Sequence, residues 1–133
     1  MTARHQVRER WHTPAETRLT PRLRLAPMYT LLRVRRQGEK RFRWTGYIYD
    51  ISRSGMRFEL DEALEPGTPV EVRAMLPGSQ TTRFSASGRV VRLHDDADEP
   101  GPIRMGLQFE QFTTKEDRLK LTRYLSQSGR RAA

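Results

Sequence analysis

The sequence predicts an all-β domain: a six-stranded antiparallel β-barrel with a short C-terminal α-helix and a flexible N-terminal tail. Short segments of the chain alternate apolar and polar residues, as strands with one buried face do. Turn-forming sequences such as Gln37-Gly38-Glu39 and Pro66-Gly67 separate these segments. After residue 113 the apolar spacing changes to that of a helix with one apolar stripe. Many short strands followed by one helix are typical of a small barrel with a covered end.

The first part of the chain predicts a tail. Residues 1 to about 26 are polar, rich in arginine and interrupted by Pro14 and Pro21, which favours an extended or mobile segment. We expect three parts in all: a flexible basic tail over 1–16, the barrel domain with its helix over 17–127, and a disordered C-terminus over 128–133. A chain of 133 residues can form one such domain without metal or disulfide.

Each strand of the barrel is predicted from its own alternating run. The runs are Met28–Val34, Phe42–Ile51, Met56–Leu60, Val70–Ala74, Phe84–Val90 and Ile103–Phe109. The first two form a hairpin through the turn at 37–39. Val91 and Leu93 are out of phase with Val90, which indicates a bulge or bend near that point.

The predicted helix has a start signal and an apolar stripe. Thr113 and Glu116 fit a capping box, and Leu121, Tyr124 and Leu125 have the spacing of one helix face. We expect the helix to fray beyond Ser128-Gly129.

Composition limits the partners and the compartment. Twenty-five basic and sixteen acidic residues give a net charge of +9, so the chain should attract anions: nucleic acid, a nucleotide messenger or an acidic protein. Most of the excess lies before residue 44. There is no cysteine, and no apolar run reaches the length of a signal peptide or a membrane span. We therefore expect a cytoplasmic protein that does not insert into membranes.

Two short motifs carry chemistry that suits a guanine nucleotide. In the first, of the form RxxxR, Arg18 and Arg22 each present a fork of donors that matches the O6 and N7 edge of guanine or a phosphate. In the second, DxSxxG, Asp50 can accept the N1-H and N2-H donors of guanine, which adenine lacks, and the Ser52 hydroxyl can add a bond. Gly55 should shape the turn, which needs either a positive φ or a backbone without Cβ.

Each motif has a simpler reading when taken alone. RxxxR arises easily in an arginine-rich chain as two solvated charges, and DxSxxG can be a turn held by its own side chains. Their occurrence together, one before the first strand and one at the end of the second, favours a ligand site.

In order and spacing the two motifs resemble those of the PilZ domain family. Ser87–Arg92 and Met105–Phe109 also look like later strands of that family's barrel, so the resemblance covers about residues 17–127. It implies a bacterial receptor for cyclic di-GMP, in which the arginines wrap the guanines and phosphates while the Asp and Ser hold a guanine. By position, the implied ligand-binding residues are Arg18, Arg22, Asp50, Ser52 and Gly55.

Two positions depart from the family pattern. Ser54 stands where many members have Gly, and Thr17 where many have a further Arg. The latter position bears on whether one cyclic di-GMP or a stacked pair is bound, so the stoichiometry stays open.

The function implied by the resemblance is that of an effector protein. Ligand binding would order the RxxxR segment onto the barrel and so alter the interaction with a downstream protein of unknown identity. We expect no enzyme and no catalytic residues, because the chain has no nucleophile elbow, no phosphate-binding loop and no suitably placed carboxylate pair.

We also expect no metal and no cofactor apart from the ligand. Without cysteine, the three histidines do not form a ligand set, and the acidic run from Asp95 to Glu99 lacks the spacing of a calcium loop.

Two alternative functions remain. In the first, a basic barrel binds RNA or single-stranded DNA through Trp44, Tyr47 and Tyr49, with Trp11 as a further aromatic residue. Half of these rings should be core residues, and Asp50 would repel a phosphate backbone, so nucleic acid is the less favoured partner. In the second, a PilZ-like module has lost its ligand and acts through protein partners alone.

Overall fold

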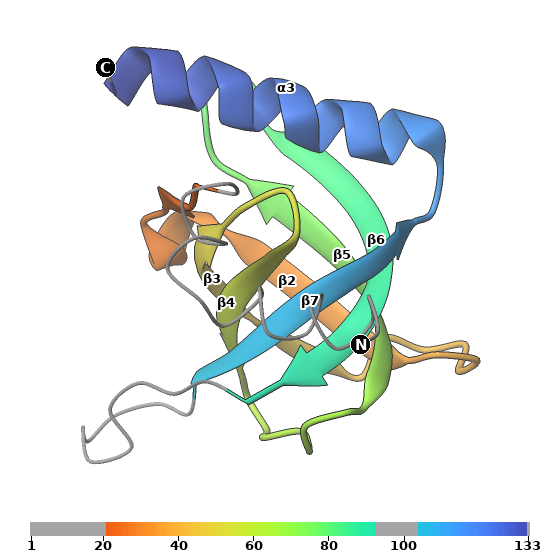
Figure 1. Cartoon of the computed structure of the whole chain (residues 1–133). Coiled ribbons are helices and arrows are strands. Elements are labelled where there is room, and N and C mark those ends of the chain that lie inside the picture. Colours follow the sequence, from red (N-terminus) through yellow and green to blue (C-terminus); the bar gives the residue numbers. More distant parts are fainter. Residues whose placement is uncertain (1–20, 93–103, 133) are drawn as a thin grey trace, which may run out of the picture.

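Six antiparallel strands close into a barrel, and one helix lies across one of its ends (Figure 1). The computed structural model describes residues 21–92 and 104–132. In chain order the elements are β1 (Leu23–Arg24), the 3-10 helix η1 (Pro27–Tyr29), β2 (Leu31–Arg36), β3 (Trp44–Ile51), β4 (Gly55–Leu60), β5 (Pro69–Leu76), β6 (Thr82–Val91), β7 (Arg104–Phe112) and the helix α3 (Lys115–Ala132). The predicted fold class, a barrel of six strands with a C-terminal helix, is confirmed. The predicted tail over 1–16 lies outside the described residues.

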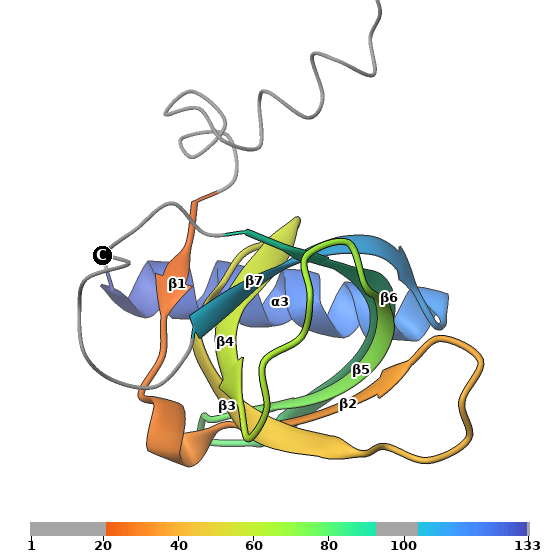
Figure 2. The same ribbon diagram turned by 90° about the horizontal axis from the view of Figure 1, so that it is seen from below.

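β3 is the strand at which the barrel closes. The sheet runs in the order β3-β2-β5-β6-β7-β4, and β4 pairs again with β3. The view along the barrel in Figure 2 shows this ring with α3 behind it. The two-residue strand β1 adds to β3 outside the ring, with Leu23 opposite Ile51 and Arg24 opposite Asp50. Closure removes the free edges of the six strands, and it brings β1, β2 and β4 together along β3.

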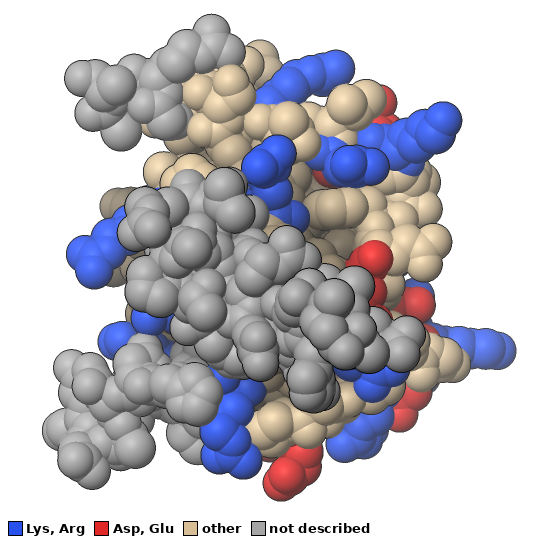
Figure 3. Space-filling model, viewed as in Figure 1, with Lys and Arg blue, Asp and Glu red and all other residues tan. Residues whose placement is uncertain are grey.

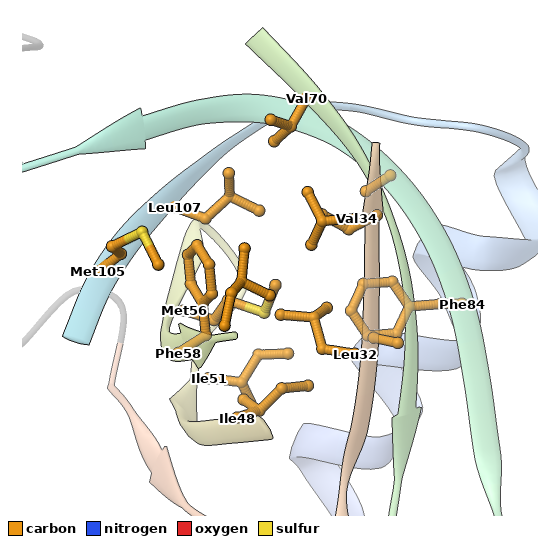
Figure 4. Packing of buried hydrophobic residues seen from close by; sticks show 14 of the residues in the cluster. Leu32, Val34, Ile48, Ile51, Met56, Phe58, Val70, Phe84, Met105 and Leu107 are labelled. Carbon is orange, nitrogen blue, oxygen red and sulfur yellow. The ribbon is translucent and has the colours of Figure 1, made fainter. Parts of the chain in front are cut away.

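The barrel interior is filled by the inward residues of every strand. Figure 4 shows these side chains meeting in the middle of the barrel. The largest of the fully buried side chains are Phe58, Phe84, Leu32, Ile48, Ile51, Leu76 and Leu107 from the strands and Leu121 from α3. Burial of such a side chain stabilises the fold by about 1.5–3 kcal/mol each. This rigid core fixes the strand ends that carry the candidate site.

Two glycines allow neighbouring strands to approach closely. Gly46 on β3 lies opposite both Leu32 and Leu60, and a Cβ there would fall within the backbone of Glu59. Gly88 on β6 has the same relation to the backbone of Gln108. At both positions the packing of the barrel leaves no space for a side chain.

The observed strands correct three details of the prediction. Met28 and Tyr29 belong to η1, which begins at Pro27, rather than to the first strand, and their side chains are exposed. Leu23–Arg24, within the predicted tail region, forms β1. The register between β6 and β7 shifts between Ser87 and Gly88, where β7 has the extra residue Glu110, rather than at the predicted position near Val90 of β6.

Helix α3 starts one residue later than the capping pattern predicts. The cap is Thr114, whose hydroxyl accepts the backbone N–H of Asp117 at 3.1 Å, while the Asp117 carboxylate accepts the backbone N–H of Thr114 at 3.0 Å. The predicted pair Thr113 and Glu116 is therefore wrong. Where the sequence predicts a frayed, disordered end from 128, the helix continues to Ala132. One interior glycine costs a helix only about 1 kcal/mol relative to Ala, which does not end it.

Asp117 also joins the helix to the barrel. Its second carboxylate oxygen accepts the backbone N–H of Ser85 on β6 at 2.9 Å. Tyr124 adds another link, because its hydroxyl donates to the carbonyl of Pro77 at 2.6 Å. Among the described residues, no helix is both long and apolar enough to span a bilayer.

Replacing Asp117 by alanine should destabilise the protein by about 2 kcal/mol, because the change removes a helix cap and leaves the Ser85 N–H without its acceptor. Urea unfolding followed by circular dichroism would measure the loss. Glu116→Ala is the matched control, since Glu116 is exposed in the same helical turn. Equal stability of the two variants would contradict the double role of Asp117.

Candidate functional site

Asp50 lies near the end of β3 and is turned to the outer side of the barrel by a bulge. Ile48 is opposite Phe58 on β4, Asp50 opposite Arg57, and the register shifts between them at Tyr49. Because of the extra residue, Ile48 and Ile51 both reach the core, and Asp50 shares a side with Arg57. Strict alternation would have pointed Asp50 inward with Ile48.

The carboxylate of Asp50 is buried between two arginines. Its Oδ2 accepts a hydrogen bond from Arg57 Nε at 2.7 Å. Its Oδ1 lies 3.8 Å from Arg22 Nη1, too far for a hydrogen bond, and it has no donor in the part of the chain that the structure describes. Asp50 is only 3% exposed, whereas the side chains of Arg22 and Arg57 are about one third exposed. Among the described residues, Oδ1 is therefore a buried acceptor that forms an ion pair with Arg22 but no hydrogen bond.

Arg22 is held beside Asp50 by the attachment of β1. Leu23 pairs with Ile51 and packs against the core, and Leu25 donates its backbone N–H to the carbonyl of Tyr49 at 2.9 Å. Arg22 directly precedes this anchored segment. The structure thus brings together one residue of each predicted motif. Arg18, the other arginine, lies outside the described residues.

Ser52 and Gly55 form the turn between β3 and β4. The backbone N–H of Ser52 donates to the Gly55 carbonyl at 2.8 Å, and the Ser52 hydroxyl accepts the N–H of Ser54 at 3.2 Å. The Ser54 carbonyl in turn accepts the N–H of Phe109 on β7 at 2.8 Å. Ser52, 2% exposed, therefore holds the turn in place.

The sequence predicts that Gly55 is needed either for a positive φ or for the absence of a Cβ, and the structure shows no positive φ at Gly55. Among the described glycines, only Gly38 and Gly67 have a positive φ, of 90° and 92°. Gly55 instead begins β4 as a buried residue opposite Gln108.

Tyr49 is the bulged residue next to Asp50. Its hydroxyl donates to Glu59, and the guanidinium of Arg104 lies 4.4 Å from its ring centre. Burial, followed by the hydrogen bond to Glu59, raises the pKa of the Tyr49 hydroxyl. The phenol thus stays protonated at neutral pH and adds no negative charge beside Asp50.

The aromatic side chains offer little surface for stacking bases. Trp44 is 4% exposed and donates its Nε1–H to Glu62 at 2.8 Å, and Tyr49 is half-buried. Tyr47 is 45% exposed, and Trp11 lies outside the described residues. Of the three strand rings proposed for nucleic acid, one therefore remains well exposed.

A broad groove begins at the β3–β4 turn and runs to the first turns of α3. Its volume is about 930 Å³, and its cationic side chains are Arg53, Lys115 and Arg118. Asp50 and Arg22 do not line it, so the acid site lies beside the groove. Figure 3 shows Lys and Arg at several places on the described surface of one face, with fewer Asp and Glu. This charge favours an anionic ligand.

Metal ligands do not gather in the described residues: no group of three or more His, Asp or Glu side chains is placed to hold an ion there. The three histidines and the acidic run at 95–99 lie outside them.

Arg57 is the site residue that the sequence prediction missed. The alternation of β4 shows only that Arg57 points outward between Met56 and Phe58. Its contact with Asp50 depends on the bulge, which sets the register between β3 and β4.

Comparisons with known proteins agree with the predicted family and fold. The PilZ domain family pattern matches residues 16–127. Among solved structures, the Bacillus subtilis inhibitor of motility MotI/DgrA is similar, with a TM-score of 0.62 and 18% sequence identity. The match covers 83% of this chain and 50% of that one, so this chain spans half the length of its structural neighbour. No curated protein matches the sequence significantly.

Proposed function

Because the chain belongs to the PilZ domain family, we propose that it is a receptor for cyclic di-GMP, with Asp50 as the group that recognises guanine. The observation that carries this proposal is the buried Oδ1 of Asp50, which has no hydrogen-bond donor among the described residues and lies beside Arg22. A buried acceptor without a hydrogen-bond donor costs free energy, and a ligand that supplies donors recovers it.

The two oxygens of Asp50 have separate roles in this proposal. Arg57 holds Oδ2 and so fixes the plane of the carboxylate. Oδ1 accepts from the N1-H and N2-H edge of guanine once the Arg22 side chain turns away from it. The guanidinium of Arg22 then bonds the O6 and N7 edge or a phosphate of the same ligand.

Arg18 is close enough along the chain to take part. It lies four positions before Arg22, and four extended residues span at most about 14 Å. Arg18 can therefore contact a ligand that is bound at Asp50, and together the two arginines would clamp it.

The output of the receptor is a change of surface. Binding orders the RxxxR segment over the end of β3, and a downstream protein recognises the altered face. With threonine at position 17, either one ligand or a stacked pair is compatible with this scheme.

Isothermal titration calorimetry is the direct test, and Arg22→Ala should weaken cyclic di-GMP binding by at least about tenfold through the loss of one bidentate contact. Arg41→Ala, which removes an exposed arginine from the β2–β3 connection, should leave the affinity within about twofold of wild type. Cyclic di-AMP should not bind, because its adenines lack the donors that Asp50 requires.

Three results would count against the proposal. They are the absence of heat on titration with cyclic di-GMP, binding of cyclic di-AMP with the same affinity as cyclic di-GMP, and an equal loss of affinity in Arg22→Ala and Arg41→Ala. The first would favour a module that acts through protein partners alone.

A further inference from the structure

A second groove lies between α3 and the outer faces of β2, β5 and β6, away from the β3–β4 turn. Its volume is about 540 Å³. Its floor and rim include two half-buried apolar side chains and four cations: Leu31, Met75, Arg33, Arg73, Arg83 and Lys120.

The strand register places two of these cations directly side by side. Arg33 on β2 is opposite Arg73 on β5, and both side chains are exposed. Like charges in directly opposed positions destabilise a sheet. Two residues before Arg33 on the same face of the sheet, Leu31 of β2 is opposite Met75 of β5, and Met75 is opposite Arg83 of β6. The outer face of the sheet therefore has an apolar row next to a row of like charges.

The nearby carboxylates do not neutralise this cluster. Asp117 borders the groove, but its two oxygens accept hydrogen bonds from Ser85 and Thr114. Glu71 is paired with Arg35 at 2.6 Å. In the described part of the chain, Arg33 and Lys120 have no carboxylate partner.

We propose that this groove docks an acidic segment of a partner protein, with an apolar side chain on Leu31 and Met75 and carboxylates on the surrounding cations. The carboxylates of such a segment would offset the repulsion between Arg33 and Arg73, and its apolar side chain would cover Leu31 and Met75. The inference does not depend on cyclic di-GMP, because none of the groove residues belongs to the Asp50 site.

The chemistry of the groove favours a peptide over a nucleic acid. Leu31 and Met75 form its accessible apolar floor, and the ring of Phe84, which also lines the groove, is only 2% exposed. Single strands, in contrast, bind by stacking bases on accessible aromatic rings. The aromatic ring beside the arginines, Phe42, already has the guanidiniums of Arg35 and Arg73 at 4.4 Å from its centre. A base would have to displace them.

The test is a titration of the full 15N-labelled chain, without nucleotide, against a synthetic peptide in which one leucine is flanked on each side by three glutamates. The amide signals of the groove strands should shift, and replacing the leucine by glycine should weaken binding about fivefold. The double variant Arg33→Gln, Arg73→Gln should bind at least about tenfold more weakly than wild type. The control double variant Arg36→Gln, Arg41→Gln changes two exposed arginines outside the groove, and its affinity for the peptide should stay within about twofold of wild type.

The thermal stability of the free protein provides a second test. Arg33→Gln should raise the thermal unfolding midpoint of the free protein, because it removes the repulsion with Arg73, whereas Arg41→Gln should not.

Several results would overturn the proposal. One is no binding, and another is binding that the groove variant and its control weaken equally. A third is tighter binding of a twelve-nucleotide oligothymidylate than of the peptide, which would make the face a nucleic-acid site. A fourth is self-association of the chain that the groove variant abolishes, which would make a second copy the occupant.

Discussion

Replacing Asp50 by asparagine is expected to lower the affinity for cyclic di-GMP by about a hundredfold, a loss of the size seen when one partner of a buried, charged hydrogen bond is removed. The amide keeps one oxygen for Arg57, which donates to Oδ2 at 2.7 Å. Its NH₂ group would then face the N1-H and N2-H donors of guanine, so that donors meet donors. Calorimetry on the purified full chain measures the loss.

The barrel itself should survive this substitution. Asn has the same shape as Asp and keeps an oxygen that accepts from Arg57, whose side chain is about one third exposed. The thermal unfolding midpoint should change by less than about 5 °C. Glu110→Gln is the matched control, because it makes the same chemical change in an exposed ion pair with Arg89. Unchanged affinity in the Asp50 variant would remove Asp50 from the site.

Gly46→Ala should cause the largest loss of stability among the substitutions considered, at least about 3 kcal/mol. The new Cβ would fall within the backbone of Glu59 on β4, and no change of side-chain rotamer can relieve a clash with backbone. β3 and β4 would have to separate at the closure of the barrel. The urea midpoint should fall correspondingly, with an unchanged dependence on urea concentration if folding stays two-state.

Thr45→Ala provides the control for strand propensity. Thr45 is the exposed neighbour of Gly46 on β3, and its loss should cost less than about 1 kcal/mol. Gly88→Ala should resemble Gly46→Ala, since its Cβ would meet the backbone of Gln108. If Gly46→Ala unfolds at the same urea concentration as Thr45→Ala, the close approach of β3 and β4 is not required for the fold.

The strands of the barrel could be predicted because their inward residues repeat with period two. The prediction was wrong where local chemistry overrides that pattern. Met28 and Tyr29 look like strand residues, but Pro27 before them favours the first turn of a helix, and η1 forms there. The helix cap was misplaced by one residue because Thr113 and Thr114 both have an acidic residue three positions later.

The site was predicted only as a list of motif residues, since their arrangement depends on contacts between strands. Asp50, Ser52 and Gly55 belong to one short segment, so their proximity follows from the sequence. The bulge at Tyr49 does not, because it is a property of the register between β3 and β4. Without that register neither the outward direction of Asp50 nor its bond with Arg57 could be foreseen. The ligand itself stays a prediction.

β1, though only two residues long, determines which way the arginine before it is aimed. Leu23 pairs with Ile51 and packs against the core, whereas Arg24 pairs with Asp50. Because side chains alternate along an extended chain, Arg22 and Arg24 lie on the same side of the strand pair as Asp50. Inserting one residue between Arg22 and Leu23 would rotate the arginine to the opposite side without altering either motif. In chains that resemble this one, the number of positions from the second arginine to the anchoring leucine therefore predicts where this arginine points. An odd number directs it toward the carboxylate, and an even number directs it away.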